Sequence, residues 1–179
     1  MHVKNISMSY LSVNFNDDCA KYGLSSALKH LGYNTNSDVI MCVGTDSVVG
    51  DSLAPMVGSL LKNTMPDAYV YGTLDKPITA LNLAPFYNKI KTMHPNSKIL
   101  VIDAAVGSRE DVGVVRVING AICPGLGVKK NLGLIGDIGI IGIVTKRSKL
   151  FIENLCSARV GLVYSMASLI SQSILMCLG

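Results

Sequence analysis

The chain has 179 residues and a formal net charge of +4; 49% of its residues are hydrophobic and only 16% are charged. This composition excludes an intrinsically disordered chain, and the length suits one α/β domain over residues 1–179. The high apolar fraction also indicates a surface that contacts another protein, for which a homo-oligomer is the simplest candidate.

The basic residues give little support to nucleic-acid binding because they are scattered. The tightest groups are Lys129 with Lys130 and residues 146–149, and neither forms the long basic stripe typical of such proteins. The first residues lack the apolar core of a signal peptide, and the five cysteines are an odd number without a CxxC pair. We therefore expect a cytoplasmic protein with reduced, buried thiols, no nucleic-acid partner and no membrane anchor.

The first part of the chain alternates predicted strands and helices. Residues 1–16 are interpreted as an arm or an edge strand, and residues 18–31 follow as a helix that Gly32 ends. Residues 39–43 form an uninterrupted apolar run, which is typical of a buried strand. After a loop, the apolar side chains of residues 52–63 recur at helical intervals.

The rest of the chain continues this alternation. The predicted elements are a short strand (68–71), a helix bent by Pro85 (78–93), a buried strand (98–102), an edge strand (112–118), a buried strand (138–144) and a helical stretch (148–178). Residues 160–178 carry no charge, but four serines and Gln172 interrupt them, so packing on the sheet is favoured over membrane insertion. Alternating strands and helices predict a three-layer αβα sandwich with a mainly parallel sheet.

Two aspartates are candidates for catalysis. Asp51 precedes the helix at 52–63 and Asp103 follows the strand at 98–102, so both are expected at the carboxyl edge of the sheet, where α/β proteins bind ligands. Two close carboxyl groups do not both ionise easily, so one stays protonated and donates while the other accepts a proton from water. This is the acid and base chemistry that adds water to a carbonyl group. Asp46 is a third candidate, for orienting either partner.

Simpler interpretations stay open for the same residues. Asp51 or Ser52 also suits the cap of the following helix, and Asp103 also suits a strand-end acid that accepts hydrogen bonds from loop amides. The three histidines, all at or before position 94, show no ligand spacing, so neither a metal site nor a cofactor is expected.

Three loops on the same expected edge are candidates for substrate contacts. They are the loop before Asp51, residues 72–77 and residues 121–130, the last being rich in glycine and ending on two lysines. A glycine-rich loop of this kind is either a tight connection or an anion site. The candidate substrate-binding residues are Gly44, Thr45, Gly50, Thr73, Asp75, Pro124, Gly125 and Gly127.

Four ordered motifs carry a resemblance to a known family. They read CVGTDSVVGDSLAPMVGSLL, VYGTLDKPITALNL, ILVIDAAVGSREDVGVV and GAICPGLGVKKNLGLIGDIGIIGIV. Together they resemble the YyaC-type sporulation proteins of spore-forming Firmicutes, which are described as spore proteases. That family is similar to the germination protease that degrades small acid-soluble spore proteins and, more distantly, to hydrogenase maturation peptidases, all on a phosphorylase/hydrolase-like α/β fold.

The resemblance implies roles for several residues. The two catalytic aspartates of the germination protease correspond by motif to Asp51 and Asp103, and its PG-x-GV loop is matched by Pro124, Gly125, Gly127 and Val128. Hydrogenase maturation peptidases also use a downstream histidine for metal, which this chain lacks. Two departures from the family pattern are Ser47 to Val49, where basic and small polar residues are usual, and Ala54, where glycine is usual.

The first functional hypothesis is therefore a cytoplasmic peptidase of the forespore or spore core that acts on a protein or peptide, with small acid-soluble spore proteins as candidate substrates. The second is a catalytically inactive member of the same fold that binds or assembles a sporulation partner. A weaker third hypothesis is an enzyme that binds an anion or a nucleotide through the loop at 121–130.

Overall fold

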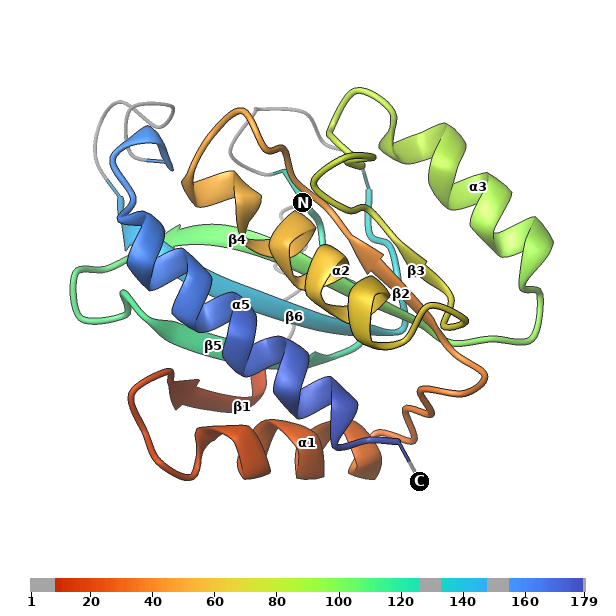
Figure 1. Cartoon of the computed structure of the whole chain (residues 1–179), viewed down its shortest axis with the longest axis horizontal. Helices are drawn as coiled ribbons and strands as arrows, with labels where there is room; N and C mark the ends of the chain where they lie inside the picture. Colours follow the sequence, from red (N-terminus) through yellow and green to blue (C-terminus); the bar gives the residue numbers. More distant parts are fainter. Residues whose placement is uncertain (1–8, 126–132, 148–154, 179) are drawn as a thin grey trace, which may run out of the picture.

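The computed structural model describes residues 9–125, 133–147 and 155–178, and a six-stranded mixed sheet lies at its centre (Figure 1). The strand order is β1-β5-β6-β4-β2-β3; the pairs β6–β4, β4–β2 and β2–β3 are parallel, and β5 is antiparallel to both of its neighbours. The strands are Ser9–Asn14 (β1), Val39–Cys42 (β2), Val70–Tyr71 (β3), Ile99–Gly107 (β4), Val114–Asn119 (β5) and Ile138–Lys146 (β6).

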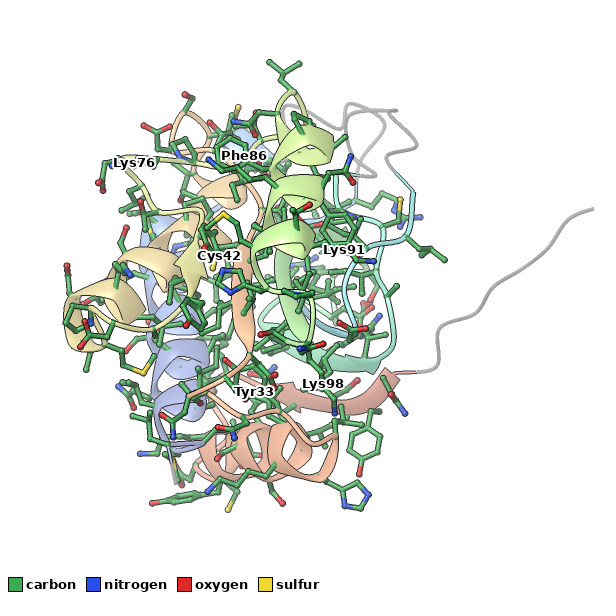
Figure 2. All side chains as sticks on the ribbon, turned by 90° about the vertical axis from the view of Figure 1, so that its right-hand side faces the viewer. Tyr33, Cys42, Lys76, Phe86, Lys91 and Lys98 are labelled. Carbon is green, nitrogen blue, oxygen red and sulfur yellow. The ribbon has the colours of Figure 1, made fainter. Side chains whose placement is uncertain are left out.

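Helices cover both faces of this sheet. Helices α1 (Ala20–His30), α2 (Leu53–Thr64) and α5 (Val160–Leu175) share one apolar core with the sheet, and α3 (Leu83–Met93) belongs to a second core on the other face. Figure 2, which looks at the molecule from the α3 side, shows this helix nearest the viewer. The predicted three-layer αβα sandwich with a mainly parallel sheet is therefore confirmed.

Strand β4 shows how the two cores are separated. Its side chains alternate between the faces, so Leu100 and Ile102 join the core of α1, α2 and α5, while Ile99 and Val101 join the core of α3. By the same alternation Asp103 belongs to the α3 side. The prediction that the strand ends at residue 102 is wrong, because β4 continues to pair with β6 as far as Gly107.

The start of helix α3 also differs from the sequence prediction. Helix α3 begins at Leu83 rather than at residue 78, because Ile78 instead forms a parallel bridge with Val43. Pro85 then lies in the first turn of α3, where its missing N–H has no intrahelical role, so it does not bend the helix.

Helix α5 proper begins at Val160. Residues 148–154 lie outside the described part of the chain, and Arg159 has an extended backbone (ψ 123°), so no single helix runs through residues 155–178. The predicted packing of this segment is confirmed, since Val163, Met166, Ile170 and Ile174 are fully buried against the sheet and its neighbours. Across the described residues, we find no helix with the length and apolar character that a membrane crossing requires.

The structure describes all five cysteines, and none of them forms a disulfide bond. Cys42 and Cys177 are buried as predicted, but Cys19 and Cys156 are exposed and Cys123 is half-buried, so the expectation of buried thiols is wrong for these three. Cys19 lies in a turn, Cys123 in a loop and Cys156 in a short helical segment before α5.

Candidate active site

The loop between β2 and α2 is folded back on itself at Gly44. The N–H of Gly44 donates to the Ile78 carbonyl oxygen (2.8 Å), and the N–H of Thr45 donates to the backbone carbonyl oxygen of Asp51 (3.2 Å). A Cβ atom at position 44 would collide with that Asp51 oxygen, and the Gly44 φ of 154° disfavours a side chain as well. Glycine at this position therefore allows the end of the loop to return to its start, which fixes Asp51 beside the end of β2.

Asp51 is half-buried in a short 3-10 turn, η1 (Gly50–Ser52), directly before α2. Gly50 is packed so closely on Leu155 that a Cβ atom would lie 2.9 Å from the Leu155 Cδ2 atom. The hydroxyl of Ser52 donates to the Val49 carbonyl oxygen (2.6 Å) and makes no capping bond to α2. The helix-cap interpretation is thus wrong for Ser52, and the turn instead positions Asp51.

Asp103 lies inside β4, at the place where its two neighbours differ. Strand β2 pairs with β4 only as far as Ile102, whereas β6 continues, so Asp103 is the first β4 residue beyond the β2 pairing. Its side chain is 7% exposed, and its Oδ2 atom accepts a hydrogen bond from the N–H of Gly125 (3.3 Å). The turn η1 contacts β4, which brings the loop of Asp51 next to Asp103.

Both carboxyl groups have raised pKa values. Burial and, as the second cause, the nearby charge of Asp51 raise the pKa of Asp103 to about 8, and hydrogen bonds from the Gly125 and Ala104 amides only partly offset these effects. Burial also raises the pKa of Asp51, while the backbone N–H of Thr45 lowers it. We call Asp51 and Asp103 the acid pair; near neutral pH Asp103 is its protonated member, which is the asymmetry that acid and base catalysis needs.

The third predicted acid is placed differently. Asp46 is exposed, and its Oδ1 atom accepts a hydrogen bond from the Thr45 hydroxyl at 3.5 Å. In the part of the chain that the structure describes, it has no hydrogen bond to either member of the acid pair. Its orienting role stays a prediction.

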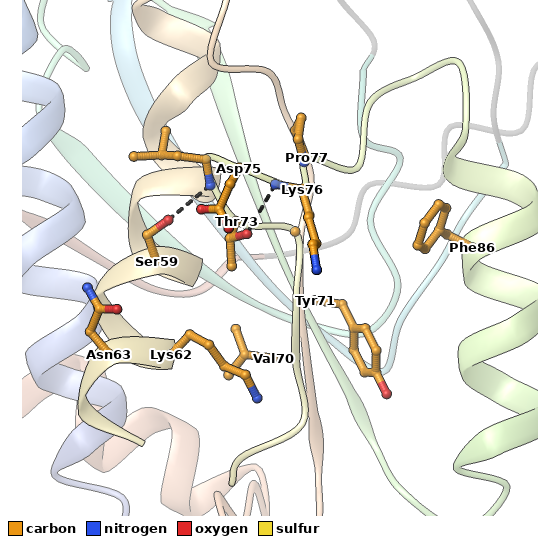
Figure 3. Close-up of a pocket in the computed structure, with 12 residues that line it drawn as sticks. Ser59, Lys62, Asn63, Val70, Tyr71, Thr73, Asp75, Lys76, Pro77 and Phe86 are labelled. Atoms are coloured by element: carbon orange, nitrogen blue, oxygen red, sulfur yellow. Dashed lines mark hydrogen bonds between the residues drawn. The ribbon is translucent and has the colours of Figure 1, made fainter. Parts of the chain in front are cut away.

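Thr73 and Asp75 lie in a hollow of their own. This β3 groove, with a volume of 610 Å³, is formed by the loop after β3 together with side chains of α2 and α3 (Figure 3). The Ser59 hydroxyl accepts a hydrogen bond from the Leu74 N–H (2.9 Å), and the Lys76 N–H donates to the Thr73 hydroxyl (3.2 Å), so the loop is held against α2. Figure 2 shows Lys76 and Phe86, which both line the groove, at the same end of the molecule.

Of the third predicted loop, only the start is described. Pro124 is buried, and Gly125 has a φ of 70° and binds Asp103 as given above, so the described start of this loop contacts one member of the acid pair. Gly127, Val128 and the two lysines lie outside the described residues. Within the described ranges no three His, Cys, Asp or Glu side chains form a cluster suited to a metal ion.

Several residues that complete the β3 groove were not predicted from the sequence. Ser59 and Lys62 come from the exposed side of α2, Tyr71 from β3 and Phe86 from α3. Their spacing in the chain carries no signal for a shared site. Phe86 is 40% exposed, but several other large apolar residues are more exposed, so exposure by itself does not mark this groove either.

Comparison with known proteins places the chain in a family. A model described as "Protein of unknown function (DUF1256)" matches residues 12–173. The chain is also 36% identical over 137 residues to the "Uncharacterized protein YyaC" of Bacillus subtilis (strain 168), which covers 76% of this chain and 67% of that protein. The resemblance to YyaC-type proteins is thereby confirmed, and the chain belongs to the DUF1256 family.

Proposed function

We propose that this protein is a peptidase that uses the acid pair to add water to a peptide bond. The observation that carries the proposal is the state of Asp103: a buried carboxyl group with a pKa of about 8, raised in part by the charge of Asp51. Burial of a carboxyl group is costly and, in a cleft beside a second acid, is a recognised mark of a functional site.

The proposed reaction divides two proton transfers between the acid pair. Asp51, ionised, takes a proton from a water molecule whose oxygen forms a bond to the peptide carbonyl carbon. Asp103, protonated, donates its proton to the carbonyl oxygen, giving a neutral tetrahedral intermediate. When the C–N bond breaks, the proton held by Asp51 passes to the leaving nitrogen, and Asp103 recovers a proton as the carbonyl re-forms.

The β3 groove and the loop that begins at Pro124 are proposed to hold the substrate chain. The groove lies at the end of β3, beside the strand whose loop carries Asp51, and it combines apolar walls with exposed charges at Lys62, Asp75 and Lys76. As parts of the same proposal, the substrate is a spore protein such as a small acid-soluble spore protein, and the site of action is the cytoplasm of the forespore.

The test is cleavage of small acid-soluble spore proteins, followed by intact mass spectrometry. The wild type, Asp51→Asn and Asp103→Asn are compared with Asp67→Asn, which makes the same chemical change at an exposed acid without a hydrogen bond in the structure. Defined fragments are expected from the wild type and Asp67→Asn, with a loss of about 10²–10⁴-fold in either member of the acid pair. Unchanged turnover in Asp51→Asn or Asp103→Asn would refute the mechanism.

A different result would favour the binding-protein alternative. If the wild type yields no fragments but retains an uncut spore protein on a column, and Asp103→Asn retains it equally, the acid pair is not used for hydrolysis. The altered segment from Ser47 to Val49, which lies between Thr45 and η1, is the feature that motivates this alternative.

A further inference from the structure

A second hollow lies at the carboxyl ends of β4 and β6, on the face covered by α5. It has a volume of 480 Å³, and its apolar walls include Val144 and Leu162, which pack within the core of α1, α2 and α5. Figure 1 shows the arrowheads of β4 and β6 on the same side of the molecule as the start of α5. This hollow shares no lining residue with the β3 groove.

Its rim carries three cations: Arg109 from the loop after β4, Lys146 from the end of β6 and Arg159 from the residue before α5. We call the hollow with these residues the basic pocket. The one ion pair among the described residues joins Arg116 to Asp111, so it involves none of the three. No aspartate or glutamate is among the described residues that line the pocket.

A further set of hydrogen-bond donors lies at the start of α5. Helix α5 is 16 residues long and begins at the pocket without a side-chain cap, so its first N–H groups and the positive end of its dipole face this region. Thr145, which is 9% exposed, also lines the pocket and places one more polar residue beside these donors.

We propose that the basic pocket binds the phosphate group of a small phosphate ester. Arginine side chains and helix N-termini are the groups that bind phosphate oxygens most strongly in proteins. The volume exceeds the needs of inorganic phosphate, and the Val144 and Leu162 side chains provide an apolar surface for the remainder of an ester. This site is independent of the acid pair and does not depend on peptidase activity.

The test measures binding of three probes by isothermal titration calorimetry at low salt: inorganic phosphate, phenyl phosphate and benzoate. Phenyl phosphate is expected to bind most tightly, inorganic phosphate more weakly and benzoate least, because the pocket combines phosphate donors with apolar walls. The variants are Arg159→Gln, Lys146→Gln and Thr145→Val, with Lys89→Gln on α3 as the matched control for loss of one exposed cation.

Each of the first two variants should weaken phenyl phosphate by about tenfold, as expected for one charged hydrogen bond, and Thr145→Val by about threefold. Lys89→Gln should bind as the wild type does. Absence of heat with either phosphate probe, benzoate binding as tightly as phenyl phosphate, or an equal loss in Lys89→Gln would each overturn the proposal. Circular dichroism of each variant verifies that a loss does not come from unfolding.

Discussion

The acid pair and the basic pocket both lie at the carboxyl edge of the sheet, but their ionisable side chains differ in solvent exposure. Asp103 is 7% exposed, and burial keeps its carboxyl group neutral up to a pH near 8. Arg109, Lys146 and Arg159 are exposed, so their charges are solvated and stay available to an incoming anion. The comparison shows that one sheet edge carries both kinds of group: burial shifts the protonation of a carboxyl group, and exposure leaves basic side chains charged.

The largest effect is expected from removing the titration of Asp103. Its pKa rises from 3.8 to about 8 on folding. The free energy of unfolding of the wild type is therefore highest below pH 4 and decreases as the pH rises toward and through 8, because ionisation of Asp103 then favours the unfolded state. Asp103→Asn cannot ionise, so its free energy of unfolding should exceed that of the wild type by about 5–6 kcal/mol above pH 8, since each pKa unit is worth about 1.4 kcal/mol. Urea titrations from pH 4 to 9 measure this difference.

The control for this measurement is Asp67→Asn, which should follow the wild type at every pH. A constant difference between Asp103→Asn and the wild type across the range would contradict the assignment of a raised pKa. A difference that grows with pH in both variants would point to general charge repulsion instead.

A second large effect is expected at Gly44, on which the acid pair depends. In Gly44→Ala the new Cβ atom would meet the carbonyl oxygen of Asp51, which is backbone and has little room to move. Gly44→Ala should lower the free energy of unfolding by about 2–4 kcal/mol, as for other severe steric changes. Thermal and urea unfolding report the loss, and a variant as stable as the wild type would show that the loop is not closed at this position.

An intermediate effect is expected on the pKa of Asp103 when its partner loses its charge. The charge of Asp51 is the second cause of the raised value, after burial. In Asp51→Asn the pKa of Asp103 should therefore fall by about one unit and stay above 3.8, because burial persists. A carbon-13 NMR titration of the Asp103 carboxyl group measures this pKa. An unchanged value in Asp51→Asn would mean that the charge of Asp51 does not act on Asp103.

The smallest effect is expected beside the basic pocket, at the glycine that contrasts with Gly44. Gly161 lies in the first turn of α5, and a Cβ atom there would have no neighbour within 4 Å. Gly161→Ala should raise the free energy of unfolding by about 0.5 kcal/mol through its helix propensity. The same unfolding experiments test it, and destabilisation by more than that amount would mean that this surface is packed more tightly than the structure describes.

Part of the candidate site was predictable because its signals are local. A long apolar run such as residues 39–43 is buried wherever it lies in the fold, and two acids that follow such runs are expected at one sheet edge. The sequence identified Gly44 as a candidate residue but did not explain why glycine is needed there. The reason is that a Cβ atom would collide with the backbone of Asp51, seven residues later. Asp46 shows the opposite limit. It follows the same apolar run as Asp51 in the sequence, but the fold leaves it exposed and, among the described residues, without a hydrogen bond to the acid pair.

The sequence by itself determined the alternation of strands and helices, the sandwich class and the two aspartates worth testing, because apolar periodicity and chain punctuation depend only on neighbouring residues. The tertiary structure alone decided that β4 extends beyond the end of its pairing with β2. This extension places Asp103 inside a strand and still beside Asp51. It also decided the grouping of Arg109, Lys146 and Arg159 at the start of α5. Pairing lengths and the meeting of distant segments arise from packing across the whole sheet, which no local pattern encodes.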